Sequence, residues 1–93
     1  MTLNKRLQQQ LKARAHSLKP VVMLGAKGLT QAVLDEVDVA LKAHELIKVK
    51  LPQSDKNQRK ETSDNIAQST LSHVIQIVGN TLILYRENPE ESK

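Results

Sequence analysis

The chain passes from a predicted strand into a predicted helix within one short stretch, Val21-Val22-Met23-Leu24-Gly25-Ala26-Lys27-Gly28-Leu29-Thr30. Its apolar first four residues predict a short buried strand, and the apolar spacing over residues 31–43 predicts a helix that Thr30 can cap. Glycine permits positive φ and a close approach of a ligand. A helix N-terminus offers unpaired N–H groups to an anion such as phosphate, and Lys27 adds a cation. The stretch predicts an anion-binding loop, although glycine at such a turn can also serve the fold alone.

An amphipathic helix is predicted before this stretch, since leucine and alanine recur at helical spacing over residues 3–18. Pro20 is expected to end it. The polar side of this helix carries Lys5, Lys12, His16 and Lys19. This basic side is either a solvated face or part of a binding surface.

The remaining elements follow from alternation and turn residues. Residues 46–51 alternate, with Lys48 and Lys50 opposite the apolar side, which is typical of a strand with one buried face. A third helix is expected after Ser54 as its cap, with a thin apolar face made by Thr62, Ile66, Ala67, Thr70 and Leu71. Two strands, 74–78 and 82–85, flank Gly79-Asn80, which predicts a tight hairpin.

The element order is therefore α-β-α-β-α-β-β. Right-handed β-α-β crossovers and the final hairpin predict a single α/β domain with a four-stranded mixed sheet packed with helices. We expect this domain to cover residues 1–87 and a polar C-terminal tail to cover residues 88–93.

Charge and composition limit the classes of partner. Residues 1–60 hold twelve Lys and Arg against five Asp and Glu, and the rest of the 93-residue chain is acidic, which indicates a polyanionic partner. Tyr85 is the only aromatic residue, so contacts to phosphate and sugar are favoured over base stacking. There is no cysteine, no signal peptide and no apolar stretch long enough to span a membrane, so we expect a cytoplasmic protein without a membrane partner.

Catalysis has little support in the sequence. The glycine spacing matches neither a P-loop nor a dinucleotide fingerprint. His16, His44 and His73 are isolated, with no metal-ligand spacing. We therefore predict no catalytic residues, no metal and no cofactor, and a small phosphotransfer or hydrolytic enzyme that uses the glycine loop is the weakest hypothesis.

A wider pattern resembles a known family. Its landmarks are Ala15-His16-x-Leu18-Lys19-Pro20-Val21-Val22, Gly25-x-x-Gly28-Leu29-Thr30, His44-Glu45-Leu46-Ile47-Lys48-Val49, Val74-Ile75-Gln76-Ile77-Val78-Gly79 and Leu82-x-Leu84-Tyr85-Arg86. Over residues 11–86 the chain resembles the CRM domain family (chloroplast RNA splicing and ribosome maturation) in its small stand-alone bacterial form, the YhbY-like proteins. One departure is visible: many relatives have Thr-Gly before the third strand, where this chain has Ser69-Thr70-Leu71-Ser72-His73.

The resemblance implies a fold similar to the C-terminal domain of bacterial translation initiation factor three, preceded by a helix. It also implies RNA binding without catalysis, and association with large ribosomal subunit precursors and their maturation. The family's G-x-x-G loop falls on Gly25, Ala26, Lys27 and Gly28.

The resulting hypothesis is an RNA-binding protein that is no enzyme, with large-subunit ribosomal RNA or a pre-ribosomal particle as its partner. We expect it to act as a monomer. The alternative is a protein-interaction adaptor of the ribosome or of an assembly factor. The candidate RNA-binding residues are Gly25, Ala26, Lys27, Gly28, Thr30, Lys5, Lys12, Lys19, Lys48, Lys50, Lys56, Arg59 and Lys60.

Overall fold

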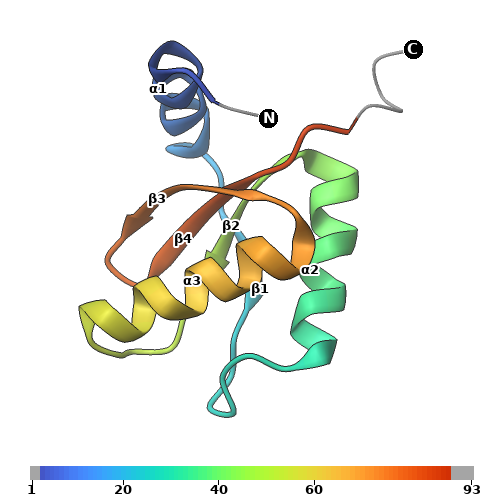
Figure 1. Ribbon diagram of the computed structural model, residues 1–93, viewed down its shortest axis with the longest axis vertical. Helices are drawn as coiled ribbons and strands as arrows, with labels where there is room; N and C mark the ends of the chain where they lie inside the picture. Colours follow the sequence, from blue (N-terminus) through green and yellow to red (C-terminus); the bar gives the residue numbers. More distant parts are fainter. Residues whose placement is uncertain (1–2, 89–93) are drawn as a thin grey trace.

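A four-stranded mixed sheet organises the computed structural model, which describes residues 3–88 (Figure 1). The strand order is β1-β2-β4-β3, with β1 parallel to β2 and the other neighbours antiparallel. The predicted class and element order are confirmed. Of the tail expected at 88–93, only residue 88 lies within the described part of the chain. The elements are α1 (Lys5–Ala15), β1 (Pro20–Met23), α2 (Gln31–His44), β2 (Leu46–Lys50), α3 (Lys56–Thr70), β3 (His73–Val78) and β4 (Thr81–Tyr85).

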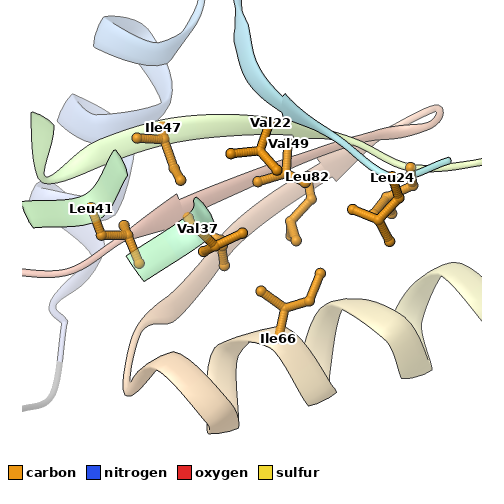
Figure 2. Close-up of a cluster of buried hydrophobic side chains, with 10 residues drawn as sticks. Val22, Leu24, Val37, Leu41, Ile47, Val49, Ile66 and Leu82 are labelled. Carbon is orange, nitrogen blue, oxygen red and sulfur yellow. The ribbon is translucent and has the colours of Figure 1, made fainter. Parts of the chain in front are cut away.

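The larger core lies between one face of the sheet and the helices α2 and α3 (Figure 2). Val37 and Leu41 of α2 and Ile66 of α3 are fully buried against strand residues such as Val49 and Leu82. Alternate residues of a strand point to one face, so the period-2 pattern of β2 places Val49 here and sends its lysines to the other side.

A smaller core lies on the opposite face, beneath α1. Leu11 and Ala15 of α1 pack on Leu46, Ile75 and Ile83. The expectation that β2 has one buried face is therefore wrong at Leu46, because α1 covers this end of the sheet. The rest of this face has no helix over it within the described part of the chain (Figure 1).

The segment between α1 and β1 corrects two expectations. The first helix ends at Ala15, and Pro20 begins β1 instead of ending the helix. The predicted buried strand is only half buried: Val21 is 51% and Met23 70% exposed, while Val22 is buried. The reason is that β1 is an edge strand with a helix over only one of its faces.

The predicted boundaries of α3 also change. Asp55, not Ser54, caps the helix, and Gln58 completes a capping box with it. The Ser54 hydroxyl instead donates a hydrogen bond to the Pro52 carbonyl (3.2 Å). Leu71, expected in the apolar face, is 82% exposed and adopts a left-handed conformation (φ 55°) just after the helix.

The end of β4 is fastened to the two large helices by Arg86. Its Nη1 donates to the Asp38 carboxylate (2.8 Å) and to the Thr70 carbonyl (2.7 Å), and its Nη2 donates to the Asp38 carbonyl (3.2 Å). Asn88 continues this attachment, because its side chain donates to two carbonyl oxygens at the C-terminus of α2. These hydrogen bonds attach the chain to α2 beyond the end of β4.

Candidate functional site

The glycine loop is an exposed turn between β1 and α2 (Figure 1). The Gly28 N–H donates to the Gly25 carbonyl (2.9 Å), which closes the turn, and Gly25, Ala26 and Lys27 are exposed. The Thr30 hydroxyl accepts from the Val33 N–H (3.2 Å), which confirms the predicted cap. The loop thus connects β1 to the capped N-terminus of α2, and the side chain of Lys27 is exposed to solvent.

The fold constrains the two glycine positions of the loop differently. Gly28 has φ +74°, a conformation that L residues rarely adopt, so the backbone requires glycine there. Gly25 has no such φ, and a Cβ added to it would meet nothing within 4 Å. The fold therefore gives no reason for glycine at position 25.

Several candidate residues lie toward the end of the sheet that leads into the loop. The Leu24 N–H donates to the Lys50 carbonyl (2.9 Å), and the Leu51 N–H donates to the Asn80 carbonyl (2.7 Å). These bonds place the loop, the end of β2, the β3–β4 turn and the approach to α3 at the same end of the sheet. Lys27, Lys50 and Lys56 are all exposed there.

The other two α3 candidates are already engaged within the protein. Arg59 Nη1 donates to the Ser54 carbonyl (2.8 Å) and to Asn80 Oδ1 (3.2 Å), so this side chain links α3 to the β3–β4 turn. Lys60 Nζ lies 3.2 Å from Asp64 Oδ2, in an exposed pair one helical turn apart. Such exposed pairs contribute little to stability, so Lys60 can exchange its partner.

The remaining candidates lie away from the loop. Lys5 and Lys12 are on α1, at the opposite end of the molecule (Figure 1). Lys19 is outside the helix, so the predicted helical face that joined it to Lys5, Lys12 and His16 does not form. Lys48 is half-buried, and its Nζ donates to the Leu18 carbonyl (2.9 Å). The structure therefore separates a loop-end group of cations from an α1 group.

The acidic residues of α2 do not behave alike. Asp35 and Glu36 are exposed, whereas Asp38 forms ion pairs with Arg86 and Lys42. The hydrogen bond from Arg86 lowers the pKa of the Asp38 carboxyl. Asp38 and Arg86 are 48 residues apart, and no local pattern signals the pair. Their role is to hold the helices that position the loop.

The described residues offer no sign of a metal site or a membrane span. Between residues 3 and 88, no three His, Asp or Glu side chains lie together as metal ligands would. No helix in that range combines the length and apolar character needed to cross a bilayer. Tyr85, the single aromatic residue, is partly buried against the core cluster beneath α1, and this burial raises the pKa of its hydroxyl.

The fold defines a known class of small α/β protein. The solution structure of a hypothetical protein from Staphylococcus aureus, described as a candidate RNA binding protein, superposes with a TM-score of 0.83 at 28% identity, covering 94% of this chain and 91% of the other. The CRS1 / YhbY (CRM) domain family matches residues 3–86, so the chain belongs to this family.

Curated relatives match over nearly the whole chain. An "RNA-binding protein" of Haemophilus influenzae is 44% identical over 96% of this chain and 90% of its own length. A "probable RNA-binding protein" of Pseudomonas aeruginosa is 38% identical over 100% of this chain and 89% of its own. Another so named, from Bacillus subtilis, is 30% identical, with coverages of 89% and 86%.

Proposed function

We propose that this protein binds RNA, without catalysis, by holding the RNA backbone at the glycine loop. The observation that carries the proposal is family membership over residues 3–86, together with relatives of nearly equal length that are named RNA-binding proteins. As a finer proposal, the RNA belongs to large ribosomal subunit precursors in the cytoplasm, whose maturation the protein assists.

The geometry of the loop supports contact with phosphate. The first N–H groups of a helix lack intrahelical partners, and the positive end of the helix dipole adds to their attraction for an anion. Thr30 satisfies one of these groups and leaves the start of α2 otherwise open. Gly25 is consistent with the same proposal. The protein itself leaves space for a side chain at this position, so glycine is not needed for packing. A side chain there would instead project into the solvent in front of the loop, where the RNA backbone would have to approach.

The loop-end cations extend the proposed footprint. Lys27, Lys50 and Lys56 are exposed at the same end of the sheet, and each can neutralise one phosphate. Lys5, Lys12, Lys19 and Lys48 would serve an RNA that also follows the face bearing α1. A short RNA held only at the loop would not need these four residues, whereas a folded RNA spanning the 39 Å length of the protein would.

Filter binding to large-subunit ribosomal RNA over a salt series tests the proposal. Binding that neutralises Z phosphates should weaken with a slope of about −0.7Z to −0.9Z in a plot of log K against log salt. The double variant Ala26→Asp/Lys27→Asp should bind much more weakly, because it places two carboxylates at the proposed phosphate site.

A matched control changes the same two residue types at the far end of α2. Lys42→Asp/Ala43→Asp alters the net charge equally, at two exposed positions outside the proposed site. It also removes the exposed ion pair between Lys42 and Asp38 (3.3 Å), so thermal unfolding must first verify that this control is folded. Binding that is insensitive to salt would contradict the proposal. An equal loss in both double variants would show that net charge, and not the loop, determines affinity.

The ribosomal partner needs its own experiment. Cell extract would be separated on a sucrose gradient, with and without ribonuclease, and the protein followed by immunoblot. Co-sedimentation with large-subunit precursors that ribonuclease abolishes is the expected result. An association that survives ribonuclease would favour a protein adaptor instead.

A further inference from the structure

A groove of about 380 Å³ runs between α3 and the edge strand β3. Its volume falls in the range of sites that enclose small organic groups. Val74 and Ile77 of β3 provide an apolar lining, and Lys56, Arg59, Lys60 and Asp64 of α3 line the opposite side. The groove is therefore apolar on one wall and charged on the other.

The apolar wall belongs to the outermost strand. Val74 and Ile77 are half-buried and pack against the larger core, so their positions are fixed. Within residues 3–88, β3 has a strand neighbour on one side only, so the backbone N–H and carbonyl groups of its other edge have no strand partner there. A flat ring lying in the groove would find the apolar side chains of Val74 and Ile77 on one side, close to this free edge of the sheet.

Arg59 supplies a rigid planar cation in the charged wall. Its two hydrogen bonds, to Ser54 and to Asn80, fix one end of the guanidinium group. RNA-binding proteins stack unpaired bases on arginine planes as well as on aromatic rings. Tyr85, the single aromatic residue, packs with α1 on the opposite face of the sheet, so Arg59 is the planar group that this groove can offer a base.

The charges around Arg59 suit a nucleotide more than a neutral ring. Lys56 and Lys60 are exposed at the groove and can meet the phosphates on either side of an inserted base. Asp64, held 3.2 Å from Lys60, can accept a hydrogen bond from an exocyclic amino group.

We infer that this groove takes the base of an unpaired RNA nucleotide, stacked on Arg59 against Val74 and Ile77. The inference rests on the proposed RNA binding and deepens it, because it adds a contact to a base. Phosphate contacts alone would not distinguish single-stranded from double-stranded RNA, whereas a base site requires an unpaired nucleotide. It also gives Arg59 a role distinct from that of Lys56, which contacts phosphate.

Photocrosslinking with the unmodified protein locates the base directly. An eight-nucleotide single-stranded RNA carrying 4-thiouridine is bound, irradiated and digested, and the crosslinked residues are identified by mass spectrometry. Crosslinks within residues 56–64 or 74–79 are expected. Crosslinks confined to other parts of the chain would overturn the inference.

Two variants separate stacking from charge. Arg59→Lys keeps the cation and loses the plane, so affinity for the oligonucleotide should fall about tenfold with an unchanged salt slope. Lys56→Ala should flatten that slope by about 0.7. Thermal unfolding of both variants verifies that each is folded. If the Arg59→Lys variant is folded and binds the oligonucleotide as well as the parent protein does, the inference is overturned.

The failure of this inference differs from the failure of RNA binding itself. A protein that binds long ribosomal RNA but not the single-stranded oligonucleotide would retain the proposed function and lose the base site. A protein that binds neither RNA would lose both.

Discussion

The two glycines of the loop should respond oppositely to the same substitution. Gly25→Ala adds a methyl group where nothing lies within 4 Å and where φ is not positive. Because alanine restricts the unfolded chain more than glycine does, this variant should be stabilised by about 0.4–1 kcal/mol. Gly28→Ala forces alanine to φ +74° and should cost about 1 kcal/mol net, since the left-handed conformation costs roughly 1–2 kcal/mol.

Urea unfolding measures both changes. A slope of about 2 kcal/mol per molar urea is ordinary for a small protein, so the midpoints should move in opposite directions by about 0.2–0.5 M. RNA affinity provides the second measurement: Gly25→Ala should bind RNA more weakly although it is the more stable protein.

Two results would refute this reasoning. If Gly25→Ala were destabilised as much as Gly28→Ala, the fold would need both glycines. The glycine at position 25 would then be no evidence that a ligand binds at the loop. If Gly25→Ala were stabilised and bound RNA at full strength, the RNA backbone would not come close to this position.

Further predictions concern the contacts that hold the site in place. Arg86→Met should lower the free energy of unfolding by about 2–3 kcal/mol, since it removes three hydrogen bonds from a side chain that is 17% exposed; a loss under about 0.5 kcal/mol in urea unfolding would contradict this. Asp38→Asn should be less stable than the parent at neutral pH. Because the folded pKa of Asp38 is lowered, its contribution is complete above the ordinary value of 3.8 and disappears as pH falls through the folded value, so acid titration should bring the two proteins together. Leu71→Gly should gain about 0.5–1 kcal/mol in thermal or urea unfolding, because glycine accepts φ 55° and the exposed leucine loses few contacts; an unchanged or lower stability would show that Leu71 is not strained.

Local patterns predicted the elements and their order, because periodicity and turn residues act over a few positions. Thr30 and the Gly79-Asn80 turn are confirmed for this reason. The cap of α3 was wrong because Ser54 and Asp55 are adjacent residues of equal capping ability, and only their hydrogen bonds distinguish them.

Contacts between distant residues could not be predicted in this way. Arg86 and its partner Asp38 are 48 residues apart, so no local spacing rule joins them, and only the fold brings them together. For the candidate site, the sequence supplied the loop and the cations. Which cations share the loop end depends on the pairing of the strands. Where the α1 lysines lie depends on the packing of α1 on Leu46 and Ile83, which could not be assigned to α1 from spacing alone.

The separate core beneath α1 has a consequence for dynamics. Leu11 and Ala15 contact a cluster that shares no buried residue with the cluster under α2 and α3. Detachment of α1 would therefore leave the larger core intact, and we expect α1 amides to exchange through a local opening below the free energy of global unfolding. Such an opening would expose Leu46 and Ile83 next to Lys48. The end of the sheet that α1 covers would then join the part of the same face that has no helix over it.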